Sequence, residues 1–342
     1  MAAPAVAVVI VTYESAEEIP ATLRAVQAQL ADGDELVVVD NASRDGSAAA
    51  ARAAAPGATV VELAGNGGFT AGCLAGAEAS TAPLLFFLNP DAVLAPGALE
   101  ALRAAAGEHP RWGAWQALVL LPGGERVNTS GGVVHWLGIG WAGQFGAPAP
   151  PPGPPHEVPF ASGAALVVRR SAWDEVGGFD PDWFMYVEDV DLSLRLRLAG
   201  WGVGVVPDAR VEHDYDFAKG DYKWFHLERN RWWAVLSAYP GLLLALAAPA
   251  LLVFEAGLLA VAASGGWLPA KLRSQAAVLR SLPRVLRRRR AVQATRVITP
   301  GAFADWLTPA LDSPYLGGPA KLPAVRWLVT AYWRAIRLLL PA

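Results

Sequence analysis

Two groups of carboxylates stand where they could do chemistry. Asp91 follows an apolar run that ends in a turn, and Glu188, Asp189 and Asp191 fall within four positions directly before a helical pattern. A carboxylate at the end of a strand suits a hard divalent cation. The acidic cluster follows the aromatic run 183–186, and carboxylates beside aromatic rings are typical of sites that handle sugars. These residues therefore indicate a cation ligand and a proton-handling cluster.

Each of these residues also has a purely structural interpretation. Asp91 could be a turn or capping residue, and acidic residues in the first turn of a helix complement its dipole. His213 ends the last predicted strand, where it could complete a cation site with Asp91 or serve packing alone. Asp40 could accept hydrogen bonds from a nucleotide base or ribose, or form an Asx turn. The predicted helices and strands around these residues must distinguish the functional interpretation from the structural one.

The elements that would position these residues alternate in type. Alanine-rich helical stretches separate short apolar runs, β-branched in the first of them, which lie at 5–13, 35–43, 59–65 and 83–94. Such runs predict strands buried on both faces of a mostly parallel sheet, and Ser15 is expected to cap a first helix at about 16–30. Ligands collect at the carboxyl ends of strands in open sheets, which is where Asp40 and Asp91 stand.

The pattern loosens after about residue 115, and the proline-dense segment 148–155 predicts a loop. Regular structure resumes within 160–180 as a strand, a short helix from about Ser171 and a Gly-Gly stop. A helix at 187–200 and a strand at 202–214 follow. The glycine-rich segment 64–69 lets the backbone approach a diphosphate, but it is no dinucleotide fingerprint because Thr70 replaces the third glycine.

Charge divides the chain into unlike parts. Residues 1–216 hold 26 acidic and 11 basic side chains, whereas residues 217–342 hold 5 acidic and 17 basic ones. An acidic half suits a cation-assisted site. The basic half contains the apolar run 241–263, so it favours anionic lipid over nucleic acid as a partner. The single cysteine, Cys73, excludes an internal disulfide and a cysteine-rich zinc site.

The run 241–263 is long enough to cross a bilayer, and Glu255 is its only charged residue. Basic residues flank it on both sides, and Pro249 lies near its middle. Both features favour two helices that dip into one leaflet, although a transmembrane segment within 235–263 or burial against protein stays open. No basic residue precedes Arg24, unlike in a secretory signal, so we expect the catalytic half at the cytoplasmic face of the membrane.

Seven motifs in order resemble family 2 of the glycosyltransferases, and most closely its bacterial rhamnosyltransferase-like branch. They span about residues 5–235 and read VVIVTYES, VVVDNASRDGS, NGGFTAG, FFLNPDAVL, SGAALVVRRSAWDEVGGFD, FMYVEDVDLSLRLRLAGW and VPDARVEHD. The resemblance implies an α/β fold of GT-A type, with a Rossmann-like, mostly parallel sheet flanked by helices. We expect a catalytic domain at 1–230, with its nucleotide half ending at about 115 and its acceptor half at 116–230, and a helical membrane-associated region at 231–342.

The resemblance also implies roles for individual residues. Asp91 and His213 would hold Mg²⁺ or Mn²⁺ on the donor diphosphate, and Asp189 would be the catalytic base, with Glu188 supporting it or contacting the acceptor. The expected nucleotide-sugar site comprises Thr12, Tyr13, Glu14, Asp40, Asn66, Gly67 and Asn89. The expected acceptor site comprises Trp183, Tyr186 and Asp191.

The implied activity is an inverting transfer of a sugar onto a hydroxyl of a lipid-linked or cell-envelope glycan. Rhamnose from dTDP-rhamnose is the favoured donor, and a UDP-sugar is the alternative. A catalytically inactive, nucleotide-binding membrane scaffold is the alternative from a different class. A nucleotidyltransferase would carry a basic triphosphate loop near its N-terminus, and segment 11–19 contains none. The usual D-x-D of the family is Asn89-Pro90-Asp91 here, which leaves one carboxylate for the metal.

Overall fold

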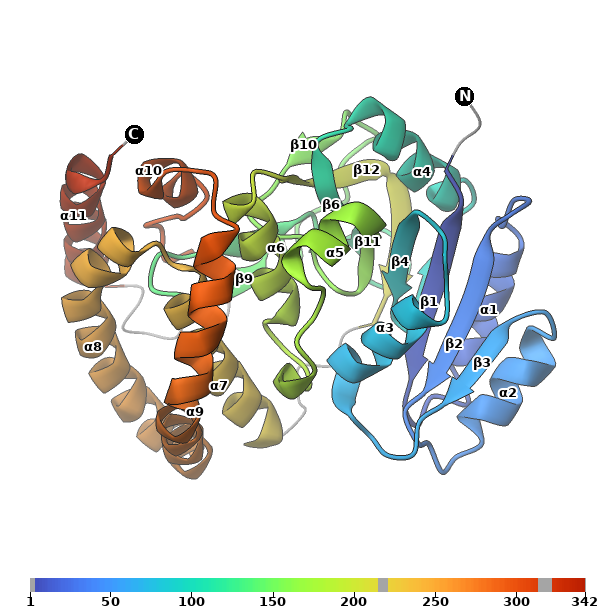
Figure 1. Ribbon diagram of the computed structural model, residues 1–342, viewed down its shortest axis with the longest axis horizontal. Helices are drawn as coiled ribbons and strands as arrows, with labels where there is room; N and C mark the ends of the chain where they lie inside the picture. Colours follow the sequence, from blue (N-terminus) through green and yellow to red (C-terminus); the bar gives the residue numbers. More distant parts are fainter. Residues whose placement is uncertain (1–3, 215–220, 313–321, 342) are drawn as a thin grey trace. The chain divides into compact units, whose positions relative to one another are not determined.

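The computed structural model describes residues 4–214, 221–312 and 322–341 (Figure 1). The chain forms two compact units. The first consists of Met1–Gly132, Ala142–Leu196 and Trp201–Asp216, and the second of Val133–Trp141, Arg197–Gly200 and Phe217–Ala342. The first unit is mixed α/β, whereas the second is mainly helical.

A ten-stranded sheet in the order β10-β12-β6-β11-β4-β1-β2-β3 organises the first unit, with β5 beside β12 and β7 beside β6. Its strands are β1 (Val6–Thr12), β2 (Glu35–Asp40), β3 (Thr59–Glu62), β4 (Leu84–Leu88), β5 (Ala92–Leu94), β6 (Trp112–Leu120), β7 (Val127–Thr129), β10 (His156–Glu157), β11 (Ala165–Arg169) and β12 (Gly202–His213). Strands β1 to β4 are parallel to one another, as are β6 and β12. β11 runs antiparallel between β4 and β6. The expected mixed, mostly parallel sheet is confirmed.

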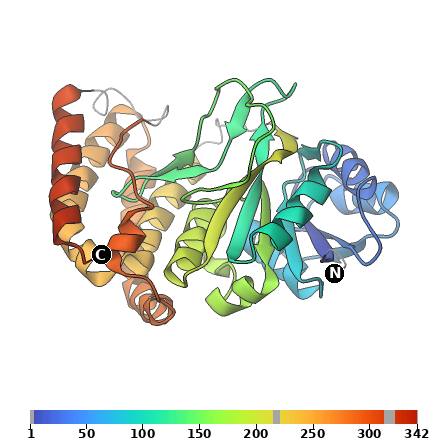
Figure 2. The ribbon, with the colours of Figure 1, turned by 90° about the horizontal axis from the view of Figure 1, so that it is seen from above.

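Helices cover both faces of this sheet, as Figures 1 and 2 show. The helices are α1 (Ile19–Gln27), α2 (Ser47–Ala54), α3 (Gly68–Glu78), α4 (Ala98–Glu108), α5 (Arg170–Val176) and α6 (Glu188–Leu198). Alternate residues of β1 point to opposite faces. Val8 and Ile10 pack in one core with α1, α2 and α4, while Val9 packs in a second core with α3, α5 and α6. Burial on both faces explains why β1 reads as an unbroken apolar run.

One local expectation in this unit is confirmed and one is wrong. The chain turns at Asn89–Asp91 as expected, and the run 83–94 continues beyond that turn as a second strand, β5. Ser15 does not cap α1, which begins at Ile19 with Glu18 at the N-cap position. The hydroxyl of Ser15 instead donates to the carbonyl of Tyr13, and its N–H donates to the hydroxyl of Ser47. Ser15 therefore ties the loop after β1 to the start of α2.

The second unit contains α7 (Asp221–Ala238), α8 (Gly241–Ser264), α9 (Leu268–Ala294), α10 (Pro300–Ala304) and α11 (Pro323–Leu339). It also contains most of the paired strands β8 (Gly132–Val134) and β9 (Gly140–Ala142). α8 is one continuous helix with Pro249 inside it, so the expectation of two helices broken at this proline is wrong. A proline removes one hydrogen bond, and the surrounding leucines and alanines are strong helix formers. In the part of the chain that the structure describes, α8 alone is long and apolar enough to cross a membrane.

Candidate active site

Two buried polar side chains stand together at the carboxyl ends of β1 and β2. Thr12 and Asp40 are register partners in adjacent parallel strands, and both are almost fully buried. Thr12 Oγ1 and Asp40 Oδ1 have no hydrogen-bond partner among the described residues. Buried polar atoms without a partner cost free energy unless a ligand or water meets them. These two atoms therefore point to a polar ligand at this edge of the sheet.

The loops beside this pair carry the other residues expected to bind the nucleotide. Tyr13 is 49% exposed, so its ring can contact a ligand. Glu14 has a φ of 53°, and its carboxylate accepts a hydrogen bond from the N–H of Arg44 at 2.9 Å. Asp40 Oδ2 accepts one from the N–H of Ser43 at 3.0 Å. Glu14 and Asp40 thus shape the loop after β2.

Asn41 holds the glycine-rich segment, a role that the sequence reading missed. Its Oδ1 accepts from the N–H of Gly67, and its Nδ2 donates to the carbonyl of Gly68, both at 2.9 Å. The amide oxygen of Asn66 accepts from the N–H of Gly68, also at 2.9 Å. Asn66 therefore forms the turn, and Asn41 fastens it to the end of β2. An asparagine directly after the strand-end Asp40 was the available signal.

Asp91, Asn89 and His213 meet although 122 residues separate Asp91 from His213. Asp91 Oδ1 lies 3.2 Å from His213 Nε2, and Asn89 Nδ2 lies 3.1 Å from the same nitrogen. His213 is brought there because the end of β12 pairs with β5, with His213 opposite Ala92. Thr22 Oγ1 donates to the carbonyl of Pro90 at 2.7 Å and fixes the turn.

A carboxylate oxygen and an imidazole nitrogen this close together fit a divalent cation. No group of three or more His, Cys, Asp or Glu side chains suited to a metal occurs in residues 4–214, 221–312 and 322–341. If a divalent cation binds here, Asp91 and His213 would supply two of its ligands.

Asp189 is held at the start of α6 by two backbone groups. Its Oδ2 accepts from the N–H of Gly163 at 3.1 Å, and its Oδ1 accepts from the N–H of Val190 at 2.8 Å. Ala164, next to Gly163, accepts from the N–H of Asn89 at 3.0 Å. Asp189 is therefore connected to the Asn89–Asp91 turn through two residues of the segment that leads into β11.

Burial raises the proton affinities of the two neighbouring carboxyls. Burial raises the pKa of Asp189, against the lowering effect of the N–H groups of Gly163 and Val190. Burial raises the pKa of Glu188 well above its usual range, and the nearby charge of Asp189 raises it further. Glu188 Oε2 is buried and has no hydrogen-bond partner among the described residues. Adjacent buried carboxyls with raised pKa values are typical of proton-transfer sites.

The segment before this cluster has an unusual backbone. Phe184, Tyr186 and Val187 have φ values of 65°, 69° and 69°, a region that non-glycine residues rarely adopt. The carbonyl of Phe184 accepts from the N–H of Thr70 at 3.2 Å, which ties this segment to the start of α3. Strained backbone of this kind clusters at ligand sites. Tyr186 is partly exposed beside the carboxyl pair, where an acceptor would bind.

Two residues expected at the acceptor site are placed differently. Asp191 is 1% exposed, and its Oδ2 accepts from Arg195 Nε at 2.8 Å. Arg195 also donates to the carbonyls of Val176 and Gly178, so this ion pair fastens α6 to the end of α5. Trp183 is fully buried, and its ring offers no face to a sugar. We therefore correct both assignments, since a buried, paired carboxylate and an enclosed indole serve packing.

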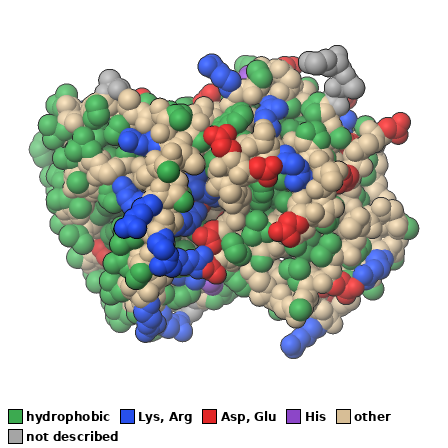
Figure 3. Space-filling model, viewed as in Figure 1, with side chains coloured by type: hydrophobic (Ala, Val, Ile, Leu, Met, Phe, Trp, Pro, Cys, Tyr) green, Lys and Arg blue, Asp and Glu red, His purple; other side chains and the backbone are tan. Residues whose placement is uncertain are grey.

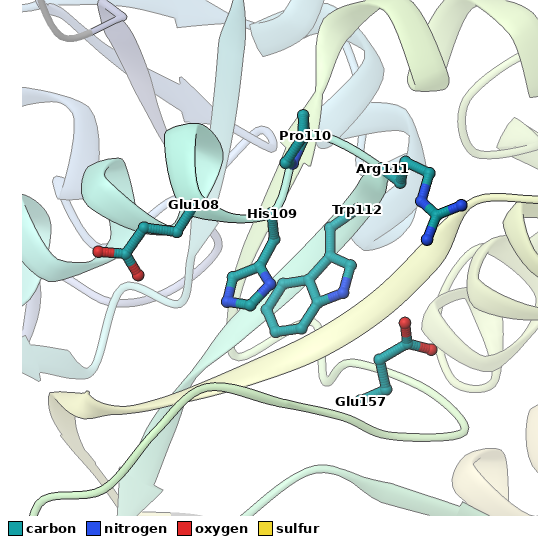
Figure 4. Close-up of a pocket in the computed structure, with 6 residues that line it drawn as sticks. All are labelled: Glu108, His109, Pro110, Arg111, Trp112 and Glu157. Carbon is teal, nitrogen blue, oxygen red and sulfur yellow. The ribbon is translucent and has the colours of Figure 1, made fainter.

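The structure also contains an open hollow of 330 Å³ away from these residues (Figure 4). Figure 4 shows its lining at the end of α4 and the start of β6, with Glu108, His109, Pro110, Arg111, Trp112 and Glu157 around it. Trp112 pairs with Gly202 at the beginning of β12, whereas His213 ends that strand. The hollow is therefore at the opposite edge of the sheet from Asp91 and His213, and none of the expected site residues lines it.

A mostly parallel α/β sheet with helices on both faces (Figure 1) and polar residues at the carboxyl ends of its strands has the architecture of a GT-A glycosyltransferase. Comparison with known families agrees, because the model described as "Glycosyl transferase family 2" matches residues 7–177. The chain belongs to glycosyl transferase family 2, and it is a glycosyltransferase.

Relatives and solved structures resemble the chain to different extents. N-acetylglucosaminyl-diphospho-decaprenol L-rhamnosyltransferase of Mycobacterium tuberculosis is 33% identical over 238 residues, which cover 60% of this chain and 75% of that protein. Rhamnosyltransferase WbbL of Escherichia coli is 40% identical over 75 residues, covering 22% of this chain and 27% of that protein. The mannosyltransferase PcManGT of Pyrobaculum calidifontis, solved with GDP-Man and Mn²⁺, has a TM-score of 0.54 at 20% identity and covers 86% of both chains. This last likeness supports the fold.

Proposed function

We propose that this protein is a metal-dependent, inverting glycosyltransferase that moves rhamnose from dTDP-rhamnose onto a hydroxyl of a lipid-linked glycan. The observation that carries the proposal is the connection of Asp189, through Gly163 and Ala164, to the turn that holds Asp91 beside His213. This connection supports a single site in which Asp91 and His213 serve the departing diphosphate and Asp189 serves the attacking hydroxyl. The rhamnosyltransferase names of the two relatives favour rhamnose among the possible sugars.

The donor nucleotide would bind at the ends of β1 and β2. Thr12 Oγ1 and Asp40 Oδ1 are the buried atoms available to the base or ribose, and Tyr13 offers an exposed ring. The loop of Asn66 and Gly67, which Asn41 fastens, brings backbone close to the donor. A divalent cation, Mg²⁺ or Mn²⁺, held by Asp91 and His213 would stabilise the charge on the departing diphosphate. Mn²⁺ in the solved mannosyltransferase is consistent with a divalent cation at this position.

The attacking side would use the carboxyl pair. Asp189 accepts the proton of the acceptor hydroxyl while that oxygen forms a bond to the anomeric carbon and the bond to the diphosphate breaks. Its raised pKa makes it a stronger base than an ordinary aspartate. Glu188, whose pKa burial raises well above its usual range, keeps its proton and donates a hydrogen bond to the acceptor. One displacement inverts the sugar.

The acceptor is proposed to be a glycan carried on a polyprenyl diphosphate. The Mycobacterium tuberculosis relative is named for such a substrate, N-acetylglucosaminyl-diphospho-decaprenol. The chain also has one helix apolar enough for a membrane, α8, which accords with a substrate that stays in lipid. We place the reaction at the cytoplasmic face of the membrane.

Asp189→Asn tests the base assignment. The substitution keeps the shape of the side chain but removes the proton acceptor, so turnover should fall by about 10²- to 10⁴-fold. Binding of dTDP, measured by calorimetry, should be unchanged. Asp174→Asn on the exposed face of α5 is the matched control and should leave turnover intact. Turnover of the Asp189 variant within threefold of the unaltered protein would refute the assignment.

The donor is tested with a panel of nucleotide sugars and decaprenyl-diphospho-N-acetylglucosamine, with Mn²⁺, with Mg²⁺ and with EDTA. We expect transfer from dTDP-rhamnose that EDTA abolishes. Transfer from a UDP-sugar alone would overturn the donor assignment. Nucleotide binding without any transfer would favour an inactive membrane scaffold.

A further inference from the structure

One face of α8 presents an uninterrupted apolar row to the outside of the second unit. Leu242, Leu252 and Val253 are 44%, 66% and 75% exposed, and no charged residue interrupts the row. Only 17% of the most apolar part of α8 is buried. A large exposed apolar surface on a protein marks a contact with lipid or with another protein.

Ion pairs join the opposite face of α8 to α7 and α9. Glu255 lies near the middle of α8 and forms ion pairs with Arg231 of α7 and with Lys271 of α9. Lys271 is completely buried, and it also bonds to Glu228 of α7. Crossing a bilayer would place Glu255 near the bilayer centre or separate it from these partners, and both are costly. α8 therefore stays packed on α7 and α9.

α7 and α9 cannot follow α8 into the hydrocarbon core. α9 exposes several arginines, among them Arg273, Arg280, Arg287 and Arg290. Such residues stay in water or among lipid head groups. The geometry thus leaves α8 one way to meet a membrane, which is sideways, with its exposed row towards lipid and its charged face towards the protein.

α11 extends this apolar surface. Trp327 and Leu328 are 71% and 61% exposed, and near the other end Leu338 is 87% exposed. Its inner face is anchored within the unit, because Trp333 stacks on Trp136 with ring centroids 5.6 Å apart. The hydroxyl of Tyr332 on the same helix donates to the carbonyl of Leu246 in α8 at 3.0 Å, so the two helices lie side by side. Exposed Arg334 lies on the same face, seven residues after Trp327 and four before Leu338, and a long arginine side chain at a membrane surface reaches the lipid head groups.

Charge identifies the partner as a lipid surface. Figure 3 shows hydrophobic side chains gathered over α8 and α11, beside a column of Lys and Arg side chains over α9. Residues 217–342 carry 17 basic and 5 acidic side chains, whereas the catalytic part is acidic. Anionic lipid attracts the basic part and repels the acidic part. A protein partner would not require this division of charge.

We propose that the second unit docks on an anionic membrane leaflet with α8 and α11 lying in the plane of the membrane, and that α8 does not span it. Both ends of α8 then lie on the same side of the membrane. Docking needs neither donor nor acceptor, so it can be tested independently of the transfer reaction.

Flotation of the full chain with vesicles tests the docking face. We expect binding to phosphatidylglycerol–phosphatidylethanolamine vesicles, with weaker binding to phosphatidylcholine vesicles. Val253→Glu should weaken binding about tenfold, because it puts a charge into the apolar row. Val297→Glu is the matched control, since Val297 is 74% exposed but lies outside α8 and α11, and it should bind normally. Equal binding by both variants would overturn the assignment of α8 to the docking face. Circular dichroism verifies that the Val253→Glu variant is folded.

Labelling of single cysteines tests the orientation of α8. Gly241→Cys and Ser264→Cys place thiols at exposed positions at its two ends, and Cys73 is buried and does not interfere. In inverted membrane vesicles, an impermeant maleimide should label both positions. In intact cells, it should label neither. Labelling of one end in cells and of the other in inverted vesicles would show a spanning helix and overturn the proposal.

Discussion

Lys271→Met removes one charge from the buried network that joins α7, α8 and α9. Glu228 and Glu255 carry two negative charges against the two positive charges of Arg231 and Lys271. Methionine keeps the length of the lysine stem but carries no charge. The carboxylates of Glu228 and Glu255 would then face the guanidinium of Arg231 alone. Removing one partner of a buried ion pair costs about 3–5 kcal/mol, because the remaining charge is left uncompensated. We expect a loss of this size in the free energy of unfolding.

The pKa of Glu255 gives a second measure of how much this charge network stabilises the fold. Burial raises its pKa, but Arg231, Lys271 and Gln275 outweigh burial and bring the pKa to about 2. Against an ordinary value of 4.5, this corresponds to about 3 kcal/mol of stability at neutral pH. A lowered folded-state pKa means that this contribution is present above pH 4.5 and is lost as the pH falls towards 2. Lys271→Met should therefore flatten the acid-induced loss of stability.

Urea unfolding followed by tryptophan fluorescence measures the free energy of unfolding. A double-mutant cycle also needs Glu255→Gln and the double variant Lys271→Met with Glu255→Gln. The double variant retains the Glu228–Arg231 pair, whose atoms lie 3.1 Å apart, so the charges balance again. It should be more stable than Lys271→Met alone. A loss below about 1 kcal/mol for Lys271→Met, or strict additivity of the two single substitutions, would refute the reasoning.

Two further predictions concern the active site. Gly68→Ala should destabilise the protein by about 2 kcal/mol or more in thermal unfolding, because Gly68 has a φ of 80° and a Cβ would lie 2.3 Å from the carbonyl oxygen of Phe184. An unchanged melting temperature would contradict this packing. Asp91→Asn should raise the Mn²⁺ concentration needed for half-maximal transfer about tenfold or more, while dTDP binding without metal stays the same. Transfer by this variant with an unaltered metal requirement would remove Asp91 from the metal site.

Periodicity and local chemistry in the sequence determined the strands of the nucleotide half. β1 and β2 are β-branched apolar runs, and β4 is a short run of leucine and phenylalanine. Their short lengths and the polar residues and turns that bound them made all three predictable as central strands to within a few residues. Polar residues at the ends of such strands predict a ligand edge, and Asp40 and Asp91 stand there. The ordered motifs added the family, which the comparisons confirm. The assignments of Thr12, Asp91, Asp189 and His213 to particular tasks stay predictions.

Tertiary structure decided what depends on distant partners. Asp91 and His213 meet because β12 pairs with β5, and this contact leaves no trace in local periodicity. Asp191 and Arg195 are neighbours on one turn of α6, but only the tertiary structure buries them, with Arg195 donating to the carbonyls of Val176 and Gly178. Pro249 and the basic flanks suggested a broken hairpin, but α8 is one continuous helix, and its Glu255 pairs with Arg231 and Lys271 on neighbouring helices. Local sequence sets which elements form, whereas long-range pairing and burial set which side chains face each other, because those contacts join residues far apart in the chain.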